Sequence, residues 1–186
     1  MTEAVKASGA ASNAVKRAAG PVRFSADSRK PRRITARGWS VRHSALLEKL
    51  YHVFSRTLLA FDRVFRFVGY GRAEKPVAFV ERGLKGFLFD CRMCGQCILS
   101  STGMSCPMNC PKQLRNGPCG GVRADGHCEV NPEMPCVWVK AWEGSRNMDE
   151  GDAILAIQPP LNQALRETSA WLRLTQEAAA SKEAGA

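Results

Sequence analysis

Cysteine is absent from the first 90 and the last 50 residues of this 186-residue chain, and histidine occurs only three times. No uncharged apolar run reaches the roughly 18 residues that a membrane-spanning helix needs. The N-terminus has no apolar segment of the kind found in secretory signals, although its Arg, Ser and Ala content also suits an organelle transit peptide. We therefore expect a cytoplasmic protein without a membrane span, in a reducing compartment that disfavours disulfide bonds.

The familiar catalytic and nucleotide-binding motifs are also missing. The sequence contains no G-x-S-x-G nucleophile motif, no P-loop and no dinucleotide-binding glycine pattern. Nothing in it suggests a scaffold that would hold a flavin or a pterin. We therefore expect no catalytic side chains in this chain.

Positive charge is abundant but unevenly distributed along the chain. The formal net charge is +10, yet residues 1–40 alone hold nine basic and two acidic residues, a net +7. These 40 residues contain almost no large apolar side chains, so they cannot offset the entropy lost on ordering. We predict a disordered basic leader over 1–40. Because the charge belongs to this leader and not to a folded face, nucleic acid is not the expected partner.

Apolar residues spaced three and four apart predict helices on the N-terminal side of the cysteines. One helix is expected from a cap at Ser44 to Val68, and a second from Glu74, with Pro76 in its first turn, up to Cys91. Together they form a predicted helical support over 41–90. Its wide apolar stripe would either pack inside this chain or dock on another subunit.

The segment after the cysteines is also predicted to be helical in part. Trp138 and Trp142 share a helical face, either as core over the cysteine loops or as a partner-facing anchor. Residues 146–186 are predicted to form a C-terminal docking segment, with a short amphipathic piece that frays into a disordered tail. The expected fold class is therefore mainly α, with a loop-rich cysteine module at 91–145 that a metal cluster stabilises.

All eight cysteines lie within 46 residues that are rich in Gly, Pro, Asn and Ser. They are Cys91, Cys94, Cys97, Cys106, Cys110, Cys119, Cys128 and Cys136. A segment so poor in apolar residues buries too little surface to fold around a core of its own. We predict that all eight are metal ligands that cross-link it.

The spacing of the first three cysteines favours iron–sulfur chemistry. Cys91, Cys94 and Cys97 are separated by two residues each, and a remote cysteine followed by proline completes the usual [4Fe–4S] ligand set. Cys106 and Cys110 both precede a proline, so either could be this fourth ligand. Eight cysteines divide into two sets of four, which predicts two [4Fe–4S] clusters.

Zinc is the main alternative, because four cysteines also bind one zinc ion tetrahedrally. The later cysteines contain no two-residue spacing, so one cluster plus zinc, or zinc alone, remains open, as do disulfides or free thiols. His127 lies beside Cys128, but eight thiolates already complete two sites. We expect His127 to be a loop residue.

The cysteine block resembles the methylenetetrahydrofolate reductase C-terminal cysteine domain over about residues 75–145. The resemblance rests on the three-cysteine run, on Cys106-Pro107 and Cys110-Pro111, and on Arg-Asn-Gly-Pro-Cys-Gly-Gly at 115–121. This family also includes small iron–sulfur subunits of reductases from some anaerobic bacteria. The resemblance implies that the eight cysteines are cluster ligands, and that the partner is a flavin-containing TIM-barrel subunit which reduces 5,10-methylenetetrahydrofolate.

The sequence contains no barrel of its own, so we predict an accessory electron-transfer subunit that relays electrons to a separate flavin-dependent reductase chain. One alternative is a zinc-stabilised scaffold whose leader binds nucleic acid or an acidic protein. Another is a cysteine domain that stabilises the reductase without redox work.

Overall fold

The computed structural model describes residues 36–184, and these residues are mainly helical, as predicted. The α-helices are α2 (Ala36–Arg42), α3 (Ser44–Ala60), α4 (Asp62–Val68), α5 (Tyr70–Phe89), α6 (Val137–Ser145) and α7 (Ala170–Ala184). Short 3-10 helices are η1 (Leu99–Ser101), η2 (Pro107–Asn109), η3 (Gly151–Leu155) and η4 (Gln163–Leu165). Within the described part, β structure is limited to two isolated bridges in the cysteine loops.

The predicted leader falls mostly outside the described residues, which begin at Ala36. Its last residues, 36–40, form the start of α2, and this short helix is anchored to the support helices. The buried hydroxyl of Ser40 donates a hydrogen bond of 2.6 Å to the backbone oxygen of Leu88. The ordered support therefore starts a few residues earlier than the sequence pattern indicated.

The first predicted helix is two helices in the structure. α3 ends at Ala60, and the N–H of Phe61 is shared between the carbonyls of Thr57 and Leu58 before α4 begins. Ser44 does not cap α3, because its hydroxyl donates instead to the backbone oxygen of Gly144 at 2.7 Å. Periodicity alone continued smoothly across this break, which is why the sequence predicted a single element.

The second helix begins four residues earlier in the structure than the predicted start at Glu74. α5 begins at Tyr70, directly after Gly69 with φ of 87°, and Pro76 lies in its interior and not in its first turn. The hydroxyl of Tyr70 donates to Asp62 at 2.5 Å and ties the start of α5 to α4. The proline removes one N–H donor from α5 without ending the helix.

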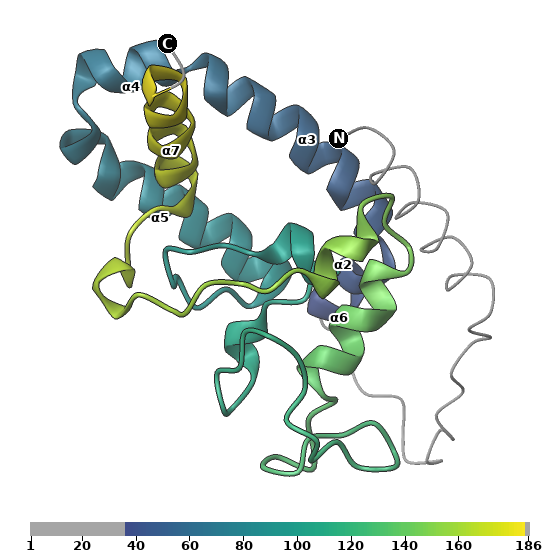
Figure 1. Ribbon diagram of the computed structural model, residues 1–186. Helices are drawn as coiled ribbons and strands as arrows, with labels where there is room; N and C mark the ends of the chain where they lie inside the picture. The colour runs from purple at the N-terminus through teal and green to yellow at the C-terminus, as the bar shows by residue number, and fades with distance from the viewer. Residues whose placement is uncertain (1–35, 185–186) are drawn as a thin grey trace.

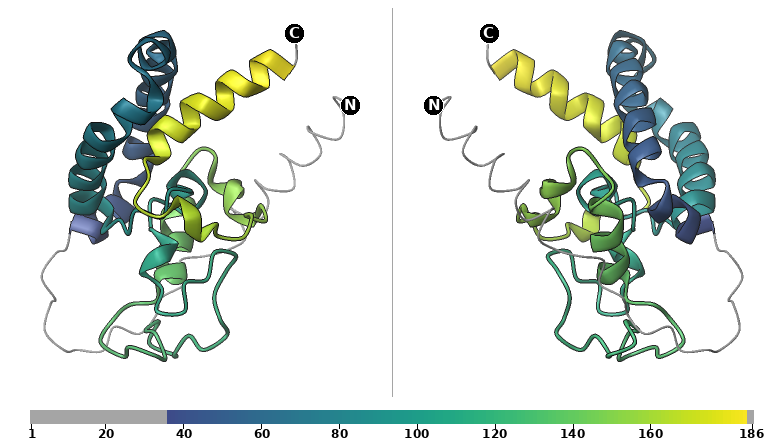
Figure 2. Two further views of the ribbon diagram at one scale, coloured as in Figure 1. Left: turned by 90° about the vertical axis from the view of Figure 1, so that its left-hand side faces the viewer. Right: turned by 90° about the vertical axis from the view of Figure 1, so that its right-hand side faces the viewer.

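The predicted C-terminal tail is also more regular than expected, because α7 runs from Ala170 to Ala184 as a continuous helix. α7 contacts all three helices of the hairpin formed by α3, α4 and α5 and crosses this hairpin in the view of Figure 1. Figure 2 shows that α7 lies on one side of the hairpin and slants away from it toward its C-terminal end. Leu172 is fully buried there, and the ring centroids of Phe54 and Trp171 are 4.7 Å apart. Packing against the hairpin stabilises a segment whose own sequence indicated fraying.

The cysteine loops lie beside one end of this helical support, with α6 packed along them (Figure 1), and Figure 2 shows the same two parts from the sides. A small apolar core joins the parts. Its buried members are Phe89, Leu99, Met104, Cys106, Met108 and Met148. Much of the apolar stripe on α3 stays outside this core, since Leu46, Leu50 and Val53 are exposed.

Candidate metal centres

Four of the eight cysteines surround one cavity next to the end of α5. They are Cys91, Cys94, Cys97 and Cys106. Cys106 belongs to the buried core, whereas Cys97 is exposed. We call these four residues the first set.

The backbone bends sharply through the first set. Asp90, Met93 and Gly95 have φ of 53°, 45° and 72°, so left-handed residues alternate with the cysteines. A side chain at Gly95 would collide with the backbone oxygen of Leu165. The N–H of Met93 lies 3.4 Å from the sulfur of Cys91, a contact typical of loops that bind metal–sulfur centres. Conformations of this kind require support from the surrounding structure.

The other four cysteines line a second cavity in the loops that precede α6. They are Cys110, Cys119, Cys128 and Cys136. The N–H of Cys128 donates to Met134, and the N–H of Cys136 donates to Gly126, so backbone hydrogen bonds of 2.9 Å fix both positions. Cys136 is also the N-cap residue of α6, where the helix dipole favours an anionic sulfur. We call these four residues the second set.

The two cysteines that precede a proline line different cavities. Cys106 joins the triple of Cys91, Cys94 and Cys97, and Cys110 joins the later cysteines, although only η2 separates the two. His127 is absent from the lining of the second cavity, and its Nδ1 atom lies 3.2 Å from the oxygen of Asp125. The expectation that His127 is a loop residue agrees with this placement.

The sulfur atoms surround each cavity at some distance from one another. All eight cysteines lie in the described part of the chain, and no three of their sulfurs are within 4.8 Å of one another. In a tetrahedral zinc site with Zn–S bonds of about 2.3 Å, the sulfurs would be about 3.8 Å apart. The two sets are therefore spread more widely than the closed shell around a single ion.

Burial makes the inner thiols of the first set hard to ionise without a cation. It raises the pKa of Cys106 to about 12 and that of Cys91 to about 11. Metal ligands must be deprotonated, so these two sulfurs become thiolates only when positive charge is close by.

The wall of the first cavity supplies such charge from residues that were not predicted to belong to the site. Lys85 lies on this wall, buried, with its Nζ 2.6 Å from the carboxylate of Glu81. Burial by itself lowers the pKa of Lys85, but the negative charges of Cys97 and Glu81 outweigh it and raise the pKa above its usual value. The i, i+4 spacing of Glu81 and Lys85 is visible in the sequence, but the sequence does not show that both side chains are buried.

Arg115 is a second cation on the same wall. It stands between Cys110 and Cys119 in the sequence, yet it lines the cavity of the first set. Its Nε and Nη2 atoms donate to the backbone oxygens of Pro159 and Gln96 at 3.3 and 3.2 Å. Only its place in the Arg-Asn-Gly-Pro-Cys-Gly-Gly run marked it beforehand.

The second cavity has a different electrostatic environment. Glu129 lies 3.5 Å from the sulfur of Cys119 and is paired with Lys112. Hydrogen bonding from Lys112 lowers the pKa of Glu129 below its usual value. Both side chains are partly open to solvent, so this pair is screened.

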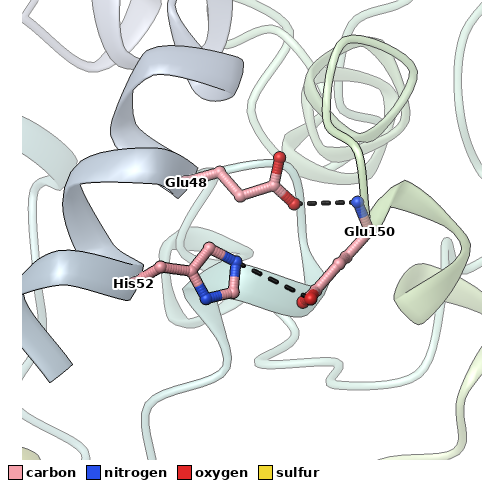
Figure 3. A group of neighbouring side chains, drawn as sticks. All are labelled: Glu48, His52 and Glu150. Carbon is pink, nitrogen blue, oxygen red and sulfur yellow. Dashed lines mark hydrogen bonds and ion pairs between the residues drawn. The ribbon is translucent and has the colours of Figure 1, made fainter. Parts of the chain in front are cut away.

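A further group of possible ligands lies away from the cysteines, where Glu48, His52 and Glu150 place one ligand atom each within 4.8 Å (Figure 3). The buried carboxylate of Glu48 already accepts hydrogen bonds from the N–H groups of Asp149 and Glu150, at 2.7 and 2.9 Å. His52 and Glu150 are only weakly paired, at 3.7 Å. These hydrogen bonds explain the group without a metal ion, because Glu48 holds the loop before η3 against α3.

Together, the fold and the two cysteine sets define a small cysteine-rich domain on a helical support. Residues 70–164 match the family described as methylene-tetrahydrofolate reductase C terminal, which covers half of the chain and all eight cysteines. The chain therefore belongs to this family, as the resemblance indicated. The match starts at the first residue of α5 and leaves out α3, α4 and α7. No curated protein and no solved structure gave a significant match. Among the described helices, none is long and apolar enough to cross a membrane.

Proposed function

We propose that the chain is an accessory electron-transfer subunit whose two cysteine sets bind one [4Fe–4S] cluster each. Its partner would be a separate flavin-containing methylenetetrahydrofolate reductase chain with a TIM-barrel fold. The observation that carries the proposal is the division of the eight cysteines into two sets of four around two cavities. Family membership supplies the link to the reductase.

The chemistry of the donor set supports clusters over isolated ions. Each cavity offers four sulfurs, which is the full ligand number of a [4Fe–4S] cluster. No three sulfurs of either set lie within 4.8 Å of one another, which suits a body larger than one ion. A bound cluster would supply a reversible one-electron couple, so no acid or base residue is needed.

The connection between the two sets supports a relay. Cys106 and Cys110 belong to different sets but are four residues apart, a distance of at most about 14 Å along extended chain. The 3-10 helix η2 shortens this path further, since its rise is only about 2.0 Å per residue. The chain thus holds its two sites close together through one short, regular segment.

Each set also has an approach from outside. Cys97 and Cys119 are exposed, one from each set. A mainly apolar groove of about 230 Å³ between α3 and α5 includes Cys97 in its lining. Another groove of about 910 Å³ beside α6 shares Pro118, Val122 and Trp138 with the second cavity. With the exposed apolar residues of α3, these grooves are the surfaces on which we expect the partner chain to dock.

One observation favours the alternative of zinc-stabilised sites in a scaffold. Each cysteine cavity encloses only about 20 Å³, which is enough for a single small ion. In that case the domain would stabilise a partner without electron transfer.

Anaerobic purification followed by iron, sulfide and zinc analysis and EPR of the reduced protein separates the two proposals. We expect two clusters in the unaltered protein. We expect Cys94→Ser and Cys128→Ser each to lose about half of the iron, because each removes a ligand from a different set. His52→Ala is the matched control and should retain all of it. Stoichiometric zinc without iron would overturn the relay and leave the scaffold.

A further inference from the structure

The wall of the first cavity carries one positive charge, on Arg115, that no carboxylate among the described residues neutralises. Lys85 is neutralised by Glu81, which also accepts hydrogen bonds from the hydroxyl of Ser169 and the N–H of Trp171. Arg115 is 7% exposed, and no carboxylate in the described part of the chain forms an ion pair with it. Its Nη1 atom is buried and has no hydrogen-bond partner among the described residues.

The two hydrogen bonds of Arg115 fix the plane of its guanidinium group. The Nε atom donates to Pro159 and the Nη2 atom to Gln96, so the group is anchored on one edge and the Nη1 atom on the other side has no hydrogen-bond partner among the described residues. Asn116 reinforces this anchor, because its side chain exchanges hydrogen bonds of 2.9 and 2.7 Å with the backbone of Gln158. The guanidinium is therefore a rigid feature of the cavity wall.

A buried cation with an unused donor is costly unless something negative lies beside it. Four thiolates around a metal centre are such a partner, and sulfur accepts hydrogen bonds from N–H groups. The residues on the wall therefore fit an anionic centre in this cavity. The second cavity has no equivalent, since its lining cation Lys112 is paired with Glu129.

We propose that Arg115 donates a hydrogen bond to the metal–sulfur centre of the first set and raises its reduction potential above that of the second. This inference rests on the proposed function. When the centre accepts one electron, its negative charge grows by one and the guanidinium stays protonated, so no proton has to move. The fixed positive charge favours the reduced state and thereby makes the two centres unequal.

The test is an EPR-monitored redox titration of the full chain under anaerobic conditions, with dithionite as the one-electron donor. Cys94→Ser and Cys128→Ser assign the two transitions to their sets. In Arg115→Gln, we expect the ratio of reduced to oxidised first centre at a fixed potential to fall at least tenfold, a shift of about 59 mV for one electron. The transition of the second set should not move. Arg123→Gln, on an exposed side chain paired with Asp125, is the matched control and should move neither.

Arg115→Lys protects the test against a purely structural effect. Lysine keeps the positive charge but lacks the forked donors of the guanidinium. The reduction potential of the first centre in Arg115→Lys should therefore lie between that of the unaltered protein and that of Arg115→Gln. Full iron content with an unchanged first transition in both variants would overturn the inference and leave the relay standing. Absence of iron from the unaltered protein would overturn both.

Discussion

The Nζ atom of Lys85 lies 2.6 Å from the Oε1 atom of Glu81, one turn earlier on α5, and both side chains are buried. The second oxygen of Glu81 accepts from the hydroxyl of Ser169 at 2.6 Å, just before α7. The ammonium group also lies 5.2 Å from the ring centre of Trp171. One carboxylate thus connects α5, the start of α7 and the wall of the first cavity.

Removing that carboxylate should destabilise the protein strongly. Glu81→Ala would leave a buried, unpaired ammonium group and two lost hydrogen bonds, so we expect the free energy of unfolding to fall by about 3–5 kcal/mol. Urea denaturation followed by circular dichroism measures it. Glu177→Ala removes an exposed partner of Arg173 and should change stability by no more than about 0.5 kcal/mol. Equal effects of the two substitutions would refute the role given to Glu81.

Gly95→Ala should destabilise the first set. The residue has φ of 72°, and a methyl group there would meet the backbone of Leu165. We expect a loss of at least about 1–3 kcal/mol, with less iron bound per chain. Gly83→Ala is the opposite control, because this exposed glycine of α5 has open space around it and should gain about 0.5–1 kcal/mol. Thermal unfolding of both variants compares them, and a neutral Gly95→Ala would contradict the prediction.

Glu48→Gln tests whether the group in Figure 3 is an anchor. The amide keeps only one acceptor oxygen for the two N–H groups of Asp149 and Glu150, so we expect a loss of about 1–3 kcal/mol. His52→Ala should have little effect, since its contact to Glu150 is exposed and long. If added zinc raised the melting temperature of the unaltered protein but not that of His52→Ala, the anchor would be the wrong description.

Chelation should loosen the cysteine loops more than the helices. The loops hold only isolated bridges and short 3-10 turns, whereas α3 and α5 both pack on α7. Metal binding to such a segment contributes directly to its folding. Hydrogen exchange should therefore rise most over residues 107–136 after metal removal, and least in α5. Uniform exchange across the chain would indicate that the whole domain depends on the metal.

The helical class and the family were predictable because each depends on a short, contiguous stretch of sequence. Steps of three and four mark a helix wherever it lies, and the Arg-Asn-Gly-Pro-Cys-Gly-Gly run is a contiguous pattern. The break at Phe61, the early start of α5 and the length of α7 were not predictable in this way. They depend on contacts between distant segments, such as Ser44 with Gly144 and Phe54 with Trp171.

The candidate sites show the same limit. Spacing identified all eight cysteines and offered two proline-flanked candidates for the fourth ligand of the triple. It could not choose between Cys106 and Cys110, because both are within reach of the triple along the chain. Nor could it show that Arg115, which stands among the second set in sequence, lies on the wall of the first cavity. These assignments require the path of the loops in space.

The exposure of Cys97 and Cys119 has a consequence for handling and for the cell. A sulfur that a partner's cofactor can approach is equally open to dioxygen and peroxide, and exposed thiolates are the ones that oxidants attack first. Under the proposed function, the isolated chain should lose iron in air faster than the chain bound to a reductase partner. Assembly would then act as a shield, and the two proteins would best be produced together.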